Sequence, residues 1–442
     1  MRWLAALPLI ASMTFAADGR GIFPYAWQEH DLPNGLRLIA IPTDYPRLVA
    51  LYIVVQAGSR NEVEPGKSGF AHLFEHMMFR GTPNYPPEKY EAVLKAAGAS
   101  SNAYTTDDYT AYHTTFSSED LERILAMEAD RFQNLTYSHA VFRTEALAVL
   151  GEYNKNSADP VNKLEEVLRA TAFDRHTYKH TTMGFLEDIL DMPNQYEYSR
   201  LFFQRYYRPE YTTIVVAGDI EPQEVKSLVE KYWGGWKRGG FRPEIPAEPP
   251  PSGPRANHIA WLSPTLPWVV VGFRGPAYSD EELDYVALDL LAYLGFSESS
   301  DLYQKLVVKE QRVDVLEAEN LPRVDPYLFN VWARVKKESD LAAVRDEILA
   351  AFENFKQKPV DETRLERVKR HLRYRFALSL SDSEAVAGTA ARYVALRRTP
   401  ATINRLFALY EKVTPAVLRA VARKYFTEQG RTIVTLAGGK SQ

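Results

Sequence analysis

The 442-residue sequence contains no cysteine. This absence excludes disulfide bonds, thiol catalysis, cysteine-ligated zinc or iron–sulfur centres and a lipidated cysteine anchor. Any bound metal ion must therefore be held by histidine, aspartate or glutamate. The chain also lacks a basic excess, since 53 Lys and Arg stand against 57 Asp and Glu and give a formal net charge of −4. We therefore expect neither nucleic acid nor an anionic membrane surface as a partner.

The sequence has few long apolar runs, and the one that could direct the chain to a membrane lies at its very start. The charged start Met1–Arg2 precedes an apolar stretch over Trp3–Phe15, and the small residues Thr14 and Ala16 suit cleavage after Ala16. This pattern predicts a signal peptide over residues 1–16 and export to the periplasm or the cell exterior. A retained membrane anchor is the alternative. Because the run is shorter than the ~20 residues of a membrane span, we expect no stable membrane insertion.

A proline-rich segment divides the remaining chain. Residues 240–254 hold six prolines in fifteen positions, which excludes a helix or a central strand and predicts an extended linker. It separates an N-terminal domain, 17–239, from a C-terminal domain, 255–442. In both domains predicted strands are followed by helical runs, and the strand predicted at 431–437 echoes the one predicted at 212–217. The element order therefore indicates an α+β protein built from two similar α/β domains.

The strongest motif is HLFEH at residues 72–76. On a helix His72 and His76 are four positions apart, so their side chains project from the same face. Two imidazoles placed in this way can both ligate one Zn²⁺. Glu75 lies on the other side of His72, where its carboxylate can reach a water molecule without ligating the metal. Apolar neighbours predict a buried helix, in which unpaired imidazoles would be costly. We interpret the motif as a metal site, and a chance pentapeptide on a surface helix is the alternative.

A catalytic zinc needs a third protein ligand and an open position. Glu145 and Glu152 are seven residues apart, two turns of the helix predicted over 139–156, so they share one face. Either could complete the metal site, and a solvated acidic stripe is the alternative. The spacing alone does not choose between the two glutamates.

These motifs resemble the pitrilysin/insulinase family of zinc metallopeptidases, the inverzincins. The likeness rests on HLFEH with Glu152 placed 76 positions after His76, and it extends from about Asn34 to Gly438. Further segments that resemble the family are SSNAYTTDDYTAYH, HTYKHTTMG, YYRPEYTTIVVAGDI and SESSDLYQKLVVKE. The chain looks most like the half-size members, which are similar to the mitochondrial processing peptidase β subunit and its bacterial relatives.

The resemblance implies a role for each motif residue. It places one Zn²⁺ per chain on His72, His76 and Glu152, makes Glu75 the catalytic base and makes Glu145 a supporting carboxylate. It also implies a fold of two homologous α/β domains, each a mostly antiparallel sheet covered by helices, which together form half of a clam-shell chamber.

Substrate contacts are implied as well, because peptides bind this family as an added strand. Asn102 and Ala103 would face the substrate backbone, and Tyr104 would line a pocket for the residue after the cleaved bond. For Tyr104, ordinary core packing is the alternative.

Other histidines carry no such signal. His176 and His180 are also four apart, but no acid lies suitably between them, so we predict structural roles. The segment 284–291 matches the register of the zinc helix and has no histidine, so the C-terminal domain should be free of metal.

In one respect the chain departs from the family pattern, and this departure bears on whether it acts with a second subunit. Members that act alone usually carry an Arg and a Tyr in the second half, aimed at the bound peptide, whereas Arg323, Tyr327 and Arg334 fit this pattern poorly. We therefore expect the chain to be the catalytic subunit of a heterodimer whose non-catalytic paralogous subunit supplies those residues. A self-sufficient homodimer is the alternative.

The sequence thus predicts an exported zinc metalloendopeptidase that hydrolyses peptides or unfolded segments inside a chamber. The competing function is a non-catalytic scaffold or binding subunit of the same fold. Chains of that kind generally lose at least one zinc residue, whereas His72, Glu75, His76 and Glu152 are all present here.

Overall fold

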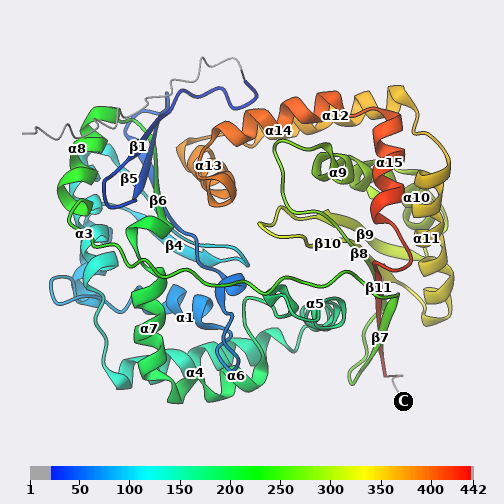
Figure 1. The fold of residues 1–442 in the computed structure, drawn as a ribbon, viewed down its shortest axis with the longest axis horizontal. Helices are drawn as coiled ribbons and strands as arrows, with labels where there is room; N and C mark the ends of the chain where they lie inside the picture. The colour runs from blue at the N-terminus through cyan, green and yellow to red at the C-terminus, as the bar shows by residue number, and fades with distance from the viewer. Residues whose placement is uncertain (1–20, 440–442) are drawn as a thin grey trace, which may run out of the picture.

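The computed structural model describes residues 21–439, so the predicted signal peptide lies outside the described residues. Two β-sheets stand side by side with helices around and between them (Figure 1). No helix within residues 21–439 is both long and apolar enough to cross a membrane.

The first sheet has six strands in the order β1-β2-β6-β3-β5-β4. Its strands are β1 (Gln28–Asp31), β2 (Arg37–Pro42), β3 (Leu48–Val55), β4 (Ser100–Thr105), β5 (Thr110–Ser117) and β6 (Thr212–Gly218). The pair β2 and β6 is parallel, and the other pairs are antiparallel. The valine- and isoleucine-rich strands β3 and β6 lie in the buried middle, as expected for strands covered on both faces. β4 forms one edge of the sheet.

The second sheet repeats this topology with five strands in the order β7-β11-β8-β10-β9. Its strands are β7 (Arg255–Trp261), β8 (Trp268–Arg274), β9 (Val313–Asn320), β10 (Leu328–Val335) and β11 (Arg431–Gly438). The pair β7 and β11 is parallel and the rest are antiparallel, as in β2-β6-β3-β5-β4. The predicted fold class of two similar α/β units with mostly antiparallel sheets is therefore confirmed.

Helices surround both sheets. The first half contributes α1 (Phe70–Met77), α2 (Pro87–Ala96), α3 (Leu121–Asn134), α4 (His139–Asn156), α5 (Pro160–Ala172), α6 (Leu186–Asp191), α7 (Tyr196–Tyr206) and α8 (Pro222–Trp233). The second half contributes α9 (Leu283–Phe296), α10 (Asp301–Tyr303), α11 (Leu341–Gln357), α12 (Glu362–Leu378), α13 (Ser383–Arg397), α14 (Ala401–Lys412) and α15 (Pro415–Tyr425). A π-helical turn over Gln304–Lys309 follows α10. Residues 240–254 contain neither helix nor strand.

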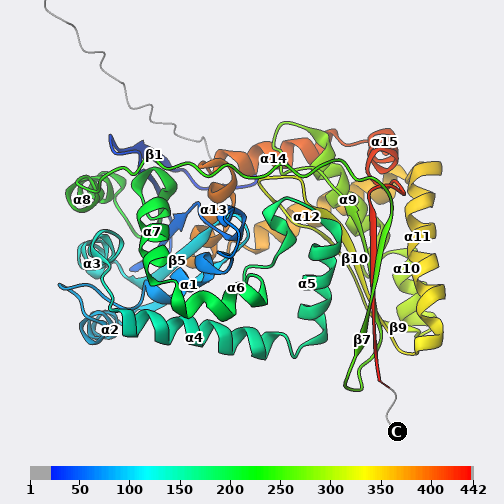
Figure 2. The ribbon, with the colours of Figure 1, turned by 60° about the horizontal axis from the view of Figure 1, so that its bottom comes forward.

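One helix of each half covers the sheet of the other half. α5 packs on β7 and β11 of the second sheet, and α13 packs on β3 and β6 of the first sheet (Figure 2). A Cβ atom at Gly388 of α13 would lie 2.9 Å from the hydroxyl oxygen of Tyr52, so glycine allows this close approach. The two halves are therefore joined by an exchange of helices.

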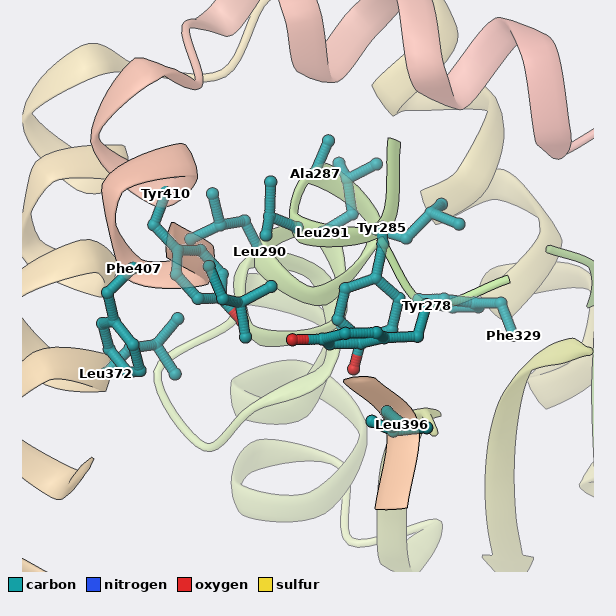
Figure 3. Packing of buried hydrophobic residues seen from close by; sticks show 14 of the residues in the cluster. Tyr278, Tyr285, Ala287, Leu290, Leu291, Phe329, Leu372, Leu396, Phe407 and Tyr410 are labelled. Atoms are coloured by element: carbon teal, nitrogen blue, oxygen red, sulfur yellow. The ribbon is translucent and has the colours of Figure 1, made fainter. Parts of the chain in front are cut away.

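The core of the second half surrounds α9. Apolar residues occur on all sides of this helix, which is typical of a helix that is buried all round. Tyr285 packs there against Tyr278 with ring centroids 5.2 Å apart, and Leu290 and Leu291 belong to the same apolar cluster as Phe407 and Tyr410 of α14 (Figure 3). The same apolar cluster includes residues of β3 in the first sheet, so the core is continuous across the two halves.

Candidate metal centre

Helix α1 carries the HLFEH motif and is fixed at its first residue. Gly69 precedes it with φ of +89°, a conformation that strains other residues, and a Cβ there would lie 2.7 Å from the carbonyl oxygen of Met183. The buried carboxylate of Glu62 accepts hydrogen bonds from the N–H groups of Gly69 (2.8 Å) and Ala71 (2.7 Å). These bonds satisfy backbone donors that would otherwise lack partners at the helix start.

Three side chains from α1 and α4 converge. The Nε2 atoms of His72 and His76 lie 3.2 Å and 3.5 Å from Oε2 of Glu152. A tetrahedral Zn²⁺ with bonds of about 2.0–2.1 Å separates its ligand atoms by about 3.3 Å, so both distances fit. Within residues 21–439 this is the one group of three histidine or acidic side chains whose ligand atoms all lie within 4.8 Å of one another. The donor types and the spacing therefore suit zinc.

Glu145 occupies a different place from Glu152, although both lie on one face of α4. Its Oε2 lies 3.7 Å from Nδ1 of His76, and its Oε1 accepts from Nε of Arg80 at 3.0 Å. The nearby imidazole of His76 and the charge of Arg80 hold the pKa of Glu145 below its usual value. Glu145 thus faces the ring nitrogen opposite the converging Nε2 atoms and can orient that ring.

Glu75 lies beside the three converging side chains. Its Oε2 accepts a hydrogen bond from the Thr105 hydroxyl at 2.7 Å and lies 3.5 Å from Nδ1 of His72. Burial alone would raise the pKa of Glu75, but the contacts with His72 and Thr105 outweigh burial and lower it. The carboxylate is therefore ionised and able to accept a proton.

The surroundings of His72 favour positive charge. Burial tends to lower the pKa of this imidazole, but Glu152 and Glu75 outweigh burial and raise it to about 9. An electrostatic environment of this kind stabilises a cation at the imidazole, whether a proton or a metal ion.

A cleft of about 320 Å³ opens at these residues and reaches the edge strand β4. Of the three predicted substrate contacts, Tyr104 lines this cleft. The side chain of Ala103 is buried in the core, and its N–H donates to Oδ1 of Asn102 at 2.9 Å. Asn102 is exposed, and neither residue lines the cleft.

The remaining histidine pair lies elsewhere. Nε2 of His176 is 2.9 Å from Oδ2 of Asp325, and Nδ1 of His180 is 2.9 Å from the carbonyl oxygen of Thr181. Both rings are buried and neither joins the converging group.

Sequence reasoning missed three residues of this site, namely Glu62, Arg80 and Thr105. Glu62 and Arg80 lie outside the HLFEH motif, and Thr105 belongs to a strand that is distant in sequence. A hydrogen-bonding residue shortly before Gly69 and a basic residue one turn after His76 were the available signals.

The insulinase family, peptidase family M16, matches residues 38–185, and the inactive domain of the same family matches residues 195–372. The chain belongs to the M16 family. The zinc protease PqqE of Helicobacter pylori is 28% identical over 412 residues, which cover 92% of this chain and 91% of the relative. The mitochondrial-processing peptidase subunit beta of Caenorhabditis elegans is 25% identical over 410 residues, 90% of this chain and 86% of that protein. The crystal structure of a protease from Helicobacter pylori superposes with a TM-score of 0.86 at 28% identity, covering 93% of this chain and 99% of that one. These similarities confirm the family resemblance and the fold.

Proposed function

We propose that the chain is a zinc-dependent metalloendopeptidase with one Zn²⁺ per chain, held by His72, His76 and Glu152. The observation that carries this proposal is the convergence of two Nε2 atoms on one carboxylate oxygen at 3.2 and 3.5 Å. When bound there, Zn²⁺ supplies Lewis acidity, which polarises a peptide carbonyl and makes water more acidic.

The other residues perform the proton transfer and the positioning. Glu75 takes a proton from the attacking water and gives it to the leaving amine, since its carboxylate is ionised and next to the metal seat. Thr105 holds that carboxylate by a hydrogen bond of 2.7 Å. Glu145, bonded to Arg80, orients the ring of His76.

The free edge of β4 receives the substrate. An extended peptide that adds to β4 would run past Tyr104 and Thr105 into the cleft. Backbone pairing through Asn102 and Ala103 gives affinity with little demand on side chains, so the substrates are peptides or unfolded segments.

A second chain completes the assembly. The relative from Caenorhabditis elegans is named as a subunit. Within this chain Tyr327 is buried and Arg323 pairs with Asp107. We therefore propose a two-chain chamber in which a non-catalytic paralogue, or a second copy of this chain, supplies further substrate contacts. Residues 17–239 and 255–442 form its two domains, and residues 1–16 direct it to the periplasm or cell exterior.

Cleavage of an internally quenched fluorescent peptide by the zinc-loaded chain tests the activity. The Glu75→Gln variant should lose at least about 10²-fold in kcat/KM, because it removes the base and keeps the side-chain size. Glu122→Gln, an exposed change on α3, serves as the control. Turnover that Glu75→Gln retains would refute the proposed mechanism. A folded chain that takes up no zinc would favour the scaffold function instead.

A further inference from the structure

A second and larger cavity, of about 1270 Å³, lies in the second half. Its walls are formed by α9, β9, α12 and α13. These elements occupy the same places in the second half as α1, β4, α4 and α5 occupy in the first. The cavity is thus the topological counterpart of the metal cleft, but the one group of three metal-binding side chains found in residues 21–439 is not in it. A ligand of this cavity would therefore be something other than the metal ion proposed for the first half.

Arg392 lines this cavity and belongs to α13, the helix that packs on β3 and β6 of the first sheet. Tyr104, which lines the metal cleft, packs against the apolar cluster that contains residues of α13. The ring of Tyr104 lies 6.2 Å from that of His113, which stacks on Tyr52, and a Cβ atom at Gly388 of α13 would lie 2.9 Å from the Tyr52 hydroxyl. Because residues four apart on a helix share a face, Arg392 lies on the face of α13 that meets these rings. A peptide that leaves the cleft past Tyr104 would meet Arg392.

The guanidinium of Arg392 is exposed, and no ion pair or side-chain hydrogen bond engages it within the part of the chain that the structure describes. Arg367 of α12 lines the same cavity, is exposed and is likewise without a carboxylate partner in residues 21–439. His371 and Arg375 continue this row at a spacing of four residues along α12. The helical wall of the cavity is therefore basic.

Acidic groups stand across the cavity on β9, but two of the three are already engaged. Asp314 accepts from Arg334 at 2.8 Å, and Glu319 accepts from the indole N–H of Trp332 at 3.0 Å. Glu317 and Glu298, which follows α9, also line the cavity and are exposed. Asp289 accepts a hydrogen bond from Tyr410 at 2.5 Å. The acidic groups thus lie on the β9 and α9 side of the cavity, and the guanidiniums of Arg367 and Arg392 lie on the α12 and α13 side, where an incoming carboxylate can bind them.

We propose that Arg392, assisted by Arg367, binds an acidic side chain of the peptide that lies on β4. The chain therefore prefers substrates that carry an aspartate or glutamate several residues from the scissile bond. This inference rests on the proposed peptidase function and names its substrate class. A guanidinium presents a planar fork of donors that matches a carboxylate with two parallel hydrogen bonds. The neighbouring tyrosine Tyr104 ties this recognition to the strand that receives the peptide.

Two quenched peptides test the proposal. They share one sequence and differ only in carrying two glutamates or two glutamines several residues from the scissile bond. The wild-type chain should favour the glutamate peptide by about fivefold in kcat/KM, the effect expected of one charge-assisted pair at a partly solvated site. Arg392→Met should bring the ratio close to one, and Arg392→Glu should invert it toward a lysine-substituted peptide.

Arg370→Met is the matched control, because Arg370 is an exposed arginine of α12 that does not line the cavity. It should keep the wild-type ratio. An Arg392→Met chain that keeps the wild-type ratio, or a wild-type ratio of one, would overturn the proposal.

Peptide binding separates this inference from the proposed activity. Fluorescence anisotropy of the same two peptides on the Glu75→Gln chain measures preference without turnover, and the preference should depend on Arg392 in the same way. If the wild-type chain cleaves neither peptide but binds the glutamate peptide more tightly through Arg392, the peptidase function fails and the acidic site stands. If it cleaves both peptides equally well, the peptidase function stands and the acidic site is overturned.

Discussion

Replacing Asp107 by asparagine removes the negative centre of a buried ion network that joins the two halves. Asp107 lies in the turn between β4 and β5 and is 1% exposed. Its Oδ1 accepts from Arg169 of α5 at 2.7 Å and from the Ser59 hydroxyl at 3.0 Å, and its Oδ2 pairs with Arg323 of the second half at 2.6 Å. Both guanidiniums are largely buried.

The substitution should lower the free energy of unfolding by about 3–5 kcal/mol, because it leaves the buried guanidinium of Arg323 without its counter-charge and that of Arg169 with Glu165 alone. A loss of that size is a large fraction of a typical total stability of about 5–15 kcal/mol. The turn that carries Asp107 also anchors the edge strand β4, so the loss should be accompanied by weaker peptide binding.

Urea unfolding followed by tryptophan fluorescence measures the loss. Asp31→Asn is the matched control, since Asp31 also binds an arginine, Arg37, but is 59% exposed, and it should cost less than about 1 kcal/mol. In a double-mutant cycle, Arg323→Met should cost much less in the Asp107→Asn background than in the wild type. An Asp107→Asn chain that loses less than about 1 kcal/mol would refute the reasoning.

Three further predictions concern the metal centre and the response to pH. Arg80→Met should weaken zinc binding by about tenfold, because Glu145 then loses the partner that holds it against His76; competition with a chelator measures this, and unchanged affinity would contradict it. Glu152→Gln should abolish both the stoichiometric zinc and the rise in Tm that zinc gives the wild type, and retention of either would show that the ligand is misassigned. Burial alone would raise the pKa of Asp325, but hydrogen bonds from His176 and Arg60 lower it to about 2. Its stabilising effect is therefore complete above about pH 4, the range of an unfolded aspartate, and is lost as the pH falls toward 2; after allowance for solvent screening it amounts to about 1–2 kcal/mol. Asp325→Asn should remove this part of the acid sensitivity, which unfolding measured from pH 5 to pH 2 would show.

Local patterns were enough to predict most elements. The helix predicted over 139–156 agrees with α4, whose first turn is capped by the Ser138 side chain, which accepts from the N–H of Val141. β7 and β9 were not predicted, since both are edge strands with many exposed polar residues and little apolar alternation. The exchange of α5 and α13 was also beyond reach, because an amphipathic helix does not specify which sheet it will cover.

The residues of the candidate metal centre likewise fall into those that a local pattern predicts and those that only the packing of distant segments brings together. The spacing of His72 and His76 on one helix face follows from helix geometry alone. Glu145 and Glu152 share a face of α4, so only the placement of α4 against α1 shows which carboxylate meets the Nε2 atoms. Thr105 approaches Glu75 from another strand, and such a contact between distant segments leaves no local pattern. The catalytic and ligand roles themselves stay predictions.

A crystal of the zinc-loaded chain, measured at the zinc absorption edge, tests the metal centre most directly. We expect one anomalous peak between α1 and α4, with bonds of about 2.0–2.2 Å to both Nε2 atoms of His72 and His76 and to a carboxylate oxygen of Glu152. Glu145 should remain outside bonding distance and contact Nδ1 of His76. A peak ligated by Glu145 in place of Glu152, or no peak at these side chains, would contradict the proposed zinc centre.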